Sequence, residues 1–272
     1  MKKFICAILA LLLLFGMVGC NLIPGSTGEG SEDSYLLKEG KLQVGTEVGY
    51  PPFEMFDEDG TTIIGLDAEL ARAIGEILGL EVEFVNTAFG GILPGLGAKK
   101  YDIVMSAVTI TPERAQTVDF SDYYIENWQA IVVKKGTTPI NSILELEGKK
   151  LAYQEAATSF EYITAFIDRG DLTCDQKEYP KILNCFDDLK LGRVDAVLCD
   201  SVVADKYVAD EPDVFEVTWN QKDTPGEEPE LFGIAVRKNN TELLNKINNA
   251  LKQLEEDGTL DGLRAKWLAS ED

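Results

Sequence analysis

Residues 65–85, GLDAELARAIGEILGLEVEFV, join an amphipathic segment to a short apolar run. The apolar residues of the first part recur at the spacing of a single helix face: Leu66, Leu70, Ile74, Ile77 and Leu78. Gly79 is suited to end that helix, and the run at 82–85 is typical of a strand. A helix that leads directly into a strand is part of a βα repeat, so this stretch predicts an α/β fold.

The same alternation continues on both sides of this stretch. Further strands are predicted at 42–45, 103–105, 131–133, 151–153, 196–199 and 233–236, and further helices at 91–99, 159–168, 186–191, after Ser201, and at 243–254. Two such series predict two lobes with mostly parallel sheets. Ligands of such sheets bind beyond the carboxyl ends of the strands. Polar and aromatic residues are expected at that rim in the segments 47–53, 106–114, 154–159 and at Asp200.

Composition removes several classes of function. The 272 residues include 25 Lys and Arg against 47 Asp and Glu, a formal net charge of −22, and no histidine. Without histidine the chain has no Ser-His or Cys-His nucleophile pair and no His-ligated zinc or haem. The acidic balance argues against nucleic-acid binding, which depends on Lys and Arg neutralising phosphates. We therefore expect no metal, no cofactor and no nucleic acid.

The N-terminal residues predict export. A basic head, Met1-Lys2-Lys3, precedes an apolar run at 4–19, which is too short for a comfortable membrane span of about 20 residues. The run ends in Met17-Val18-Gly19-Cys20, which resembles a bacterial lipoprotein signal with Cys20 as the lipidated residue. Residues 20–34 then form the lipidated cysteine and a flexible tether, holding the protein at the outer face of the membrane. The alternative is a soluble secreted protein cleaved near this point.

Beyond the export signal the cysteines are Cys174, Cys185 and Cys199. Export allows a disulfide between Cys174 and Cys185, and the sequence leaves this pairing open. The spacing contains no CxxC motif and so does not favour a metal site. Cys199 ends an apolar run and is expected to behave as a small buried hydrophobe.

The segments 106–114, SAVTITPER, and 118–124, VDFSDYY, resemble family 3 of the bacterial extracellular solute-binding proteins, which supply polar amino acids to ABC importers. The resemblance extends to 45–47, 50–53, 65–67, 89–96, 192–197, 257–259 and 266–267. It implies a Venus-flytrap (periplasmic-binding-protein) fold, in which two hinge strands join two α/β lobes. Lobe 1 would comprise 35–127 plus 229–272, and lobe 2 would comprise 128–228, with the hinge near 125–128 and 228–232.

A free amino acid presents a carboxylate and an ammonium, and each needs a charged partner when it is buried. The Arg114 guanidinium is suited to the carboxylate, although residue type alone favours an ion pair with an acid such as Asp119. The resemblance assigns Arg114 to the ligand carboxylate. It assigns Asp200 to the ammonium, with an N-cap role for the helix near Ser201 as the alternative.

The resemblance also implies the remaining contacts. Ser106, Ala107, Thr109 and Thr158 would bind the charged groups, and Tyr50 and Phe89 would flank the ligand side chain unless they serve only as core. Glu47 and Gln154 would meet its far end, with Glu155 and Glu230 nearby. One departure is Ala156-Ala157-Thr158, where the family often has Gly-Thr-Thr.

Acidic and aromatic residues favour arginine, lysine or ornithine, with glutamine next. Lobe closure on the ligand would then be recognised by the transmembrane subunits of the permease, with the binding protein as a monomer. The alternative is an enzyme on the same fold, similar to cyclohexadienyl dehydratase, in which Glu47 or Glu155 would act as general acid or base.

Overall fold

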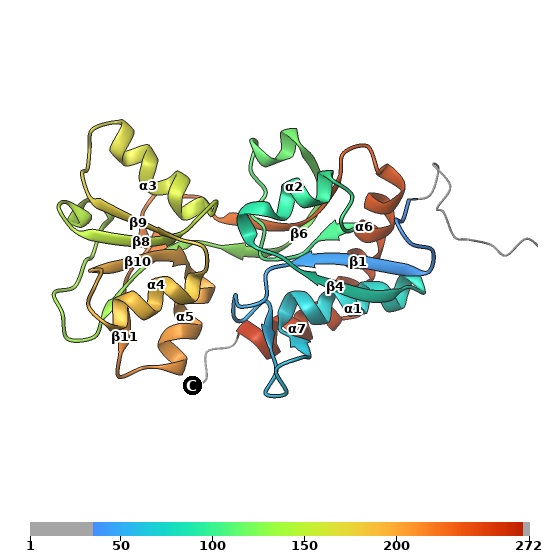
Figure 1. Cartoon of the computed structure of the whole chain (residues 1–272), viewed down its shortest axis with the longest axis horizontal. Coiled ribbons are helices and arrows are strands. Elements are labelled where there is room, and N and C mark those ends of the chain that lie inside the picture. The colour runs from blue at the N-terminus through green and yellow to red at the C-terminus, as the bar shows by residue number, and fades with distance from the viewer. Residues whose placement is uncertain (1–34, 269–272) are drawn as a thin grey trace, which may run out of the picture.

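The computed structural model describes residues 35–268, so the predicted signal, the lipidated Cys20 and the tether lie outside the described residues. The chain forms two lobes side by side, each built on a five-stranded sheet (Figure 1). This confirms the two-lobe α/β fold. We call the part around the first sheet, with α1, α2, α6 and α7, the first lobe, and the part around the second sheet, with α3, α4 and α5, the second lobe.

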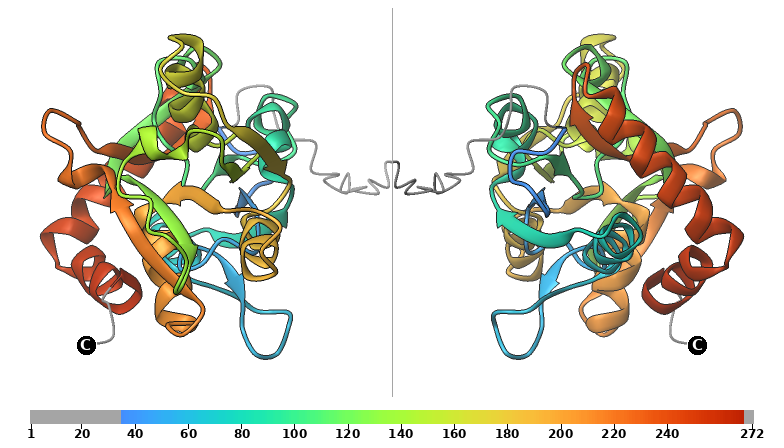
Figure 2. Two further views of the ribbon diagram at one scale, coloured as in Figure 1. Left: turned by 90° about the vertical axis from the view of Figure 1, so that its left-hand side faces the viewer. Right: turned by 90° about the vertical axis from the view of Figure 1, so that its right-hand side faces the viewer.

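The sheet of the first lobe has the order β4-β1-β5-β12-β6. Its strands are β1 (Lys41–Thr46), β4 (Glu81–Asn86), β5 (Ile103–Val104), β6 (Val118–Asn127) and β12 (Glu230–Arg237). β1 is parallel to β4 and β5, whereas β12 is antiparallel to β5 and β6. A separate two-stranded hairpin, β2 (Met55–Phe56) with β3 (Ile63–Ile64), projects from the body (Figure 2).

The sheet of the second lobe has the order β11-β7-β10-β8-β9. Its strands are β7 (Gln129–Lys134), β8 (Lys150–Gln154), β9 (Asp175–Tyr179), β10 (Ala196–Asp200) and β11 (Phe215–Asn220). β8, β9 and β10 run parallel, but β7 is antiparallel to β10 and β11. The prediction of mostly parallel sheets was therefore wrong for β6, β7, β11 and β12, because the chain crosses between the lobes there and returns against its neighbours.

Helices cover both faces of each sheet. They are α1 (Leu66–Leu78), α2 (Ile92–Gly97), α3 (Thr158–Asp168), α4 (Ile182–Lys190), α5 (Ser201–Asp210), α6 (Thr241–Glu256) and α7 (Thr259–Leu268). In the first lobe α1, α6 and α7 pack on one face and α2 on the other; in the second lobe α4 and α5 lie opposite α3. The helix predicted at 186–191 begins earlier, at Ile182, and the one predicted at 91–99 is shorter.

Alternating side chains divide the core of the second lobe between the two faces of its sheet. Ala130 and Val132 of β7 pack with α4 and α5, whereas Ile131 and Val133 pack on the α3 side. This alternation is the period of two that places successive strand side chains on opposite faces. Each face therefore receives its own apolar cluster.

The same division explains the cysteines. Cys185 is buried on the α4 side of the sheet, and Cys174 packs against the α3 side. Both are free thiols, so the possible disulfide between them is not formed. Cys199 is buried beside Cys185 in the same apolar cluster, as expected of a small hydrophobe.

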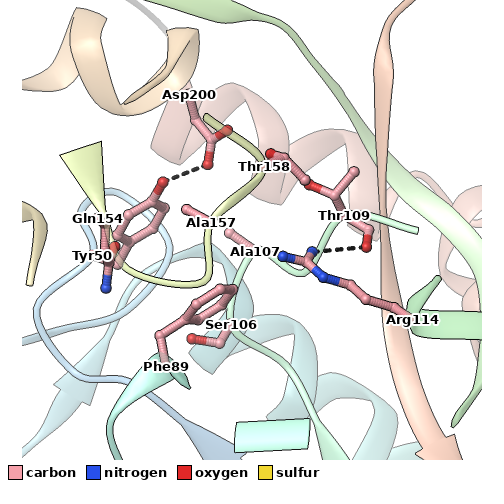
Figure 3. Close-up of a pocket in the computed structure, with 10 residues that line it drawn as sticks. All are labelled: Tyr50, Phe89, Ser106, Ala107, Thr109, Arg114, Gln154, Ala157, Thr158 and Asp200. Atoms are coloured by element: carbon pink, nitrogen blue, oxygen red, sulfur yellow. Dashed lines mark hydrogen bonds between the residues drawn. The ribbon is translucent and has the colours of Figure 1, made fainter. Parts of the chain in front are cut away.

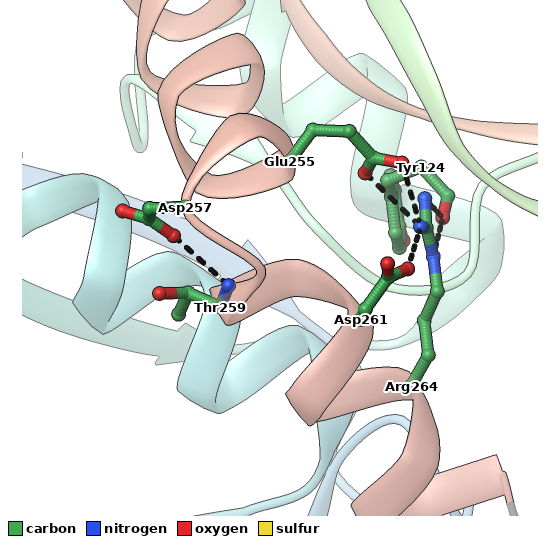
Figure 4. Close-up of polar contacts among 6 residues, drawn as sticks. All are labelled: Tyr124, Glu255, Asp257, Thr259, Asp261 and Arg264. Carbon is green, nitrogen blue, oxygen red and sulfur yellow. Dashed lines mark hydrogen bonds and ion pairs between the residues drawn. The ribbon is translucent and has the colours of Figure 1, made fainter.

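The last helices are fixed to the strand that leads towards the second lobe. Arg264 of α7 donates to the main-chain oxygen of Tyr124 on β6, at 2.9 and 3.1 Å, and forms ion pairs with Glu255 and Asp261 (Figure 4). Asp257 accepts the Thr259 N–H at the start of α7. Within residues 35–268, no helix combines the length and apolarity needed to cross a membrane.

Candidate functional site

A cavity of about 280 Å³ lies between the two lobes (Figure 3). It is lined by Tyr50, Phe89, Ser106, Ala107, Thr109, Arg114, Gln154, Ala157, Thr158 and Asp200. Every residue predicted for the ligand site is in this lining except Glu47, and Ala157 is an addition.

Strand ends position these side chains. Ser106 and Ala107 follow the carboxyl end of β5, Gln154 ends β8, and Asp200 ends β10. Strand ends from both sheets therefore meet at the cavity, which is where ligands of α/β sheets bind. Thr158, the first residue of α3, adds a helix N-terminus, where free N–H groups favour a negative group.

Arg114 is a buried cation held by neutral groups. Its side chain is 9% exposed and donates to the main-chain oxygens of Thr109 at 3.0 Å and Ala156 at 2.9 Å. The pair with Asp119 does not form, because that acid bonds Lys238 at 2.8 Å. Burial lowers the pKa of the Arg114 guanidinium, although arginine stays charged in proteins. A buried positive charge without an ion-pair partner is suited to a carboxylate.

Ala156 adopts a left-handed backbone with φ of 59°, which brings its carbonyl to Arg114. Glycine takes this conformation without steric cost, whereas alanine pays about 1–2 kcal/mol. The chain therefore keeps the geometry that the family's Gly-Thr-Thr sequence favours. The neighbouring Ala157 lines the cavity, so the missing threonine hydroxyl would have faced that space.

Asp200 is the acidic counterpart of Arg114. Its carboxylate accepts bonds from the Tyr50 hydroxyl, from Asn127 at 2.7 Å and from Gln129 at 3.1 Å. It occupies the N-cap position of α5 but makes no side-chain bond to the helix, so the capping alternative is not realised. Burial and the adjacent Glu230 raise the pKa of Asp200 above its usual range.

Glu230 is more central than its sequence context indicated. One of its carboxylate oxygens lies within 3.0 to 3.4 Å of donors from both lobes and the hinge: Thr109, Asn127, Gln129 and Thr158. Burial raises its pKa as well. The sequence signal for this position was only its place at the predicted hinge, where Glu230 begins β12.

The aromatic pair serves both as core and as cavity wall. Tyr50 belongs to the main apolar cluster and donates to Asp200, while Phe89 packs beside α2. The Phe89 ring centroid lies 5.7 Å from the Arg114 guanidinium carbon, within cation–π range. Both rings line the cavity, and Tyr50 is also part of the core.

Glu47 lies directly behind the cavity wall. It is 2% exposed, and its Oε2 accepts the Gln154 amide at 2.5 Å, while its Oε1 has no hydrogen-bond partner. Burial raises the pKa of Glu47, and the nearby Lys181 opposes that shift. Glu155 is half-buried against Gly90 and lines no part of the cavity.

The closed arrangement depends on bonds between the lobes. Tyr50, Arg114 and Glu47 of the first lobe bond Asp200, Ala156 and Gln154 of the second, in that order. Among residues 35–268, no cluster of acidic or thiol side chains has the arrangement of a metal site.

The sequence matches, over residues 42–270, the profile of a family described as bacterial extracellular solute-binding proteins, family 3. The chain belongs to this family. This confirms the predicted resemblance and means that this solute-binding protein is exported.

Named relatives bind different amino acids. ABC transporter arginine-binding protein 1 of Escherichia coli K12 is 34% identical over 239 residues, covering 84% of this chain and 90% of the relative. The L-cystine-binding protein TcyJ of the same strain is 32% identical and covers 95% of each chain. The protein is therefore similar to the amino-acid-binding components of ABC transporters.

Solved structures of amino-acid-binding proteins share the fold of this chain. An ancestral arginine-binding protein bound to arginine has a TM-score of 0.78 and 42% identity, covering 85% of this chain and 99% of that one. The ancestral amino acid-binding protein AncCDT-1, a precursor of cyclohexadienyl dehydratase, has a TM-score of 0.76 and 39% identity, with coverages of 85% and 96%. That neighbour is itself described as a binding protein. The family and these relatives are solute-binding proteins, so the prediction of a protein that is not an enzyme is confirmed and the dehydratase alternative is set aside.

Proposed function

We propose that this protein captures a cationic amino acid, arginine before lysine or ornithine, with glutamine as a weaker ligand. The orientation of Gln154 is the observation that carries this choice. Its amide nitrogen donates to Glu47 at 2.5 Å and to the main-chain oxygen of Pro180 at 3.2 Å. Both amide hydrogens are then used, so the amide oxygen is the polar atom that Gln154 offers a ligand. An acceptor at this point suits a guanidinium or ammonium group.

The charges around the cavity support the same ligand class. The α-carboxylate of an amino acid would pair with Arg114 and its α-ammonium with Asp200. Glu47, which is buried, and Glu230, which is half-buried, then remain as acids bonded to residues of the cavity lining. A positive side chain would offset this surplus, whereas a neutral side chain would leave it uncompensated.

Capture would proceed by closure of lobe 2 (128–228) onto lobe 1 (35–127 plus 229–272). Arg114 and Asp200 belong to different lobes, so a ligand that contacts both favours the closed state over the open one. The transmembrane subunits of an ABC permease would then accept the ligand from the closed monomer. Lipidation of Cys20 would keep the protein near that permease, at the outer face of the cell membrane.

A thermal-shift screen of the twenty amino acids, ornithine and cystine tests this proposal. A ligand that binds only the folded state stabilises it and so raises the melting temperature. At a ligand concentration a hundred times Kd, the stabilisation is about 2.7 kcal/mol. Arginine should give the largest shift, followed by lysine or ornithine and then glutamine. A largest shift with cystine or with an acidic amino acid would contradict the assignment, and no shift with any of them would contradict amino-acid capture.

A further inference from the structure

Two buried carboxyl groups lie behind the cavity and take no part in the proposed ligand contacts. Glu54 is fully buried and Asp67 is 1% exposed. In the part of the chain that the structure describes, no lysine or arginine forms an ion pair with either group. Two negative charges in such a place are very costly, so the pair needs another way to reduce its charge.

The main chain forces these two residues together. The Asp67 N–H donates to the Phe53 carbonyl at 3.0 Å, one residue before Glu54. At Gly65 a Cβ atom would stand 2.2 Å from the Phe53 oxygen and 2.9 Å from the Glu54 nitrogen, and its φ is 121°. The close approach of the Gly65 segment to the main chain at Phe53 and Glu54 therefore requires glycine. This approach fixes where Glu54 and Asp67 lie relative to each other.

Each carboxyl group has one bonded oxygen and one without a partner. Glu54 Oε1 accepts the Ser106 hydroxyl at 2.5 Å, and Asp67 Oδ2 accepts the Ala107 N–H at 2.8 Å and the Tyr124 hydroxyl at 2.9 Å. Glu54 Oε2 and Asp67 Oδ1 are both buried without a hydrogen-bond partner. A proton placed between them would satisfy both oxygens and remove one charge.

We propose that Glu54 is protonated at neutral pH and donates its O–H to Asp67, and that this acid–carboxylate pair positions the Ser106–Ala107 turn of the ligand site. The inference deepens the proposed function and rests on it for the link to ligand binding. Glu54 and Asp67 are positioning residues, because they act through the turn and do not line the cavity.

The turn needs such support. Ala107 adopts φ of 47°, a left-handed conformation that is costly for alanine, and it lines the cavity. Strained residues of this kind persist only where their surroundings hold them. Asp67 holds the Ala107 N–H, and Glu54 holds the adjacent Ser106 side chain.

The groups facing the pair favour protonation. Burial raises the pKa of Glu54 well above its usual range, and the charges of Asp67 and Glu47 raise it further, while the Ser106 hydroxyl opposes the shift. Burial also raises the pKa of Asp67, opposed by the Ala107 N–H and the Tyr124 hydroxyl. Tyr50, whose main chain bonds that of Glu54, stays neutral because burial raises its pKa. Loss of the shared proton to solvent base would leave two adjacent negative charges.

Carbon NMR of the ligand-free protein tests the proton directly. The side-chain carboxyl carbon of Glu54, assigned from its disappearance in E54Q, should show the chemical shift of a protonated acid at pH 7. Exposed Glu76, on the same helix as Asp67, should show that of a carboxylate. A carboxylate shift for Glu54 at pH 7 would overturn the proposal, whatever ligand the protein binds.

Variants test the positioning role. In E54Q the amide oxygen accepts from Ser106 and the amide N–H replaces the donated proton, so the affinity for L-arginine should stay within about twofold, as in the control E76Q. E54L leaves Asp67 unpaired and should weaken binding about tenfold or more, with a shifted Ala107 amide resonance in the ligand-free protein. An unshifted Ala107 resonance in E54L, or an equal loss of affinity in E54Q and E54L, would remove the role. Failure of the wild-type protein to bind any amino acid would overturn the proposed function but leave the NMR result for the proton intact.

Discussion

Arg114 and Asp200 are both buried charges at the cavity, but they are held in different ways. Arg114 is fixed by the main-chain carbonyls of Thr109 and Ala156, which no side-chain replacement removes. Asp200 is fixed by side-chain donors, and a second acid, Glu230, shares two of them, Asn127 and Gln129. The positive end of the cavity is therefore formed by Arg114 alone among the lining residues, whereas at the negative end Asp200 is supported by Glu230.

The difference teaches how the two ends should respond to change. A single arginine has no neighbour that can replace it, and its charge does not titrate at accessible pH. The two acids share donors, burial raises the pKa of both, and Glu230 raises that of Asp200 further, so they compensate for one another and respond to protons. Mutation should therefore act most strongly at Arg114, and pH should act only at the acidic end.

Arg114→Ala should abolish amino-acid binding, with a loss of about 3–5 kcal/mol, because the ligand carboxylate would be buried without a partner. Isothermal titration with arginine measures the loss. Arg169→Ala is the matched control, because Arg169 is exposed and its ion pair with Asp171 lies on the surface. Wild-type affinity in Arg114→Ala would show that the carboxylate binds elsewhere.

Asp200→Asn should weaken binding by a smaller amount, about 2 kcal/mol, because Glu230 remains beside the ligand ammonium. The same titration is repeated with Asp210→Asn, an exposed acid on α5, as the control. A loss equal to that of Arg114→Ala would indicate that Glu230 does not compensate and that the two ends are equivalent.

Glu47→Gln should separate ligands by their side-chain charge. Affinity for arginine should fall about tenfold, a cost of about 1.4 kcal/mol, while affinity for glutamine should change little. Equal losses for the two ligands would remove Glu47 from a role in specificity. Exposed Glu58→Gln, in the hairpin loop, should change neither affinity.

The pH dependence should be opposite for binding and for stability. A ligand ammonium favours ionised Asp200 and Glu230, so arginine affinity should fall as the pH drops from 8 to 5 through their raised pKa values. The same raised pKa values mean that the ligand-free folded state retains protons that the unfolded state has lost. Its unfolding free energy should therefore decrease as the pH rises from about 4 to the raised pKa values.

Titration with arginine and urea unfolding, each at pH 5 and pH 8, measure these two trends. Asp200→Asn should flatten part of both trends. Arg114→Ala should steepen the stability trend, because the Arg114 charge lowers the pKa of both acids. If affinity and stability changed in the same direction with pH, the acids at the negative end of the cavity would not be the groups that titrate.

Much of the fold followed from local patterns. The helix at 66–78, its end at Gly79 and the following strand are encoded by the spacing of apolar residues and by a single glycine. The strand at 233–236 was predicted, but the antiparallel direction of β12 and the whole of β6 were missed, because strand direction depends on how the chain passes between the lobes. Likewise, the sequence left the Cys174–Cys185 pairing open, and the fold places these two residues on opposite faces of the second sheet.

The sequence by itself determined the α/β class, the acidic charge, the family and the residue types that meet at the cavity, because these depend on composition, periodicity and motif. Only the tertiary structure decided that Glu47 bonds Gln154, that Glu230 accepts from donors of both lobes, and that the Asp67 main chain bonds the residue next to Glu54. The physical reason is distance along the chain. Glu47 and Gln154 are 107 positions apart, and no local pattern carries the hydrogen bond that joins them.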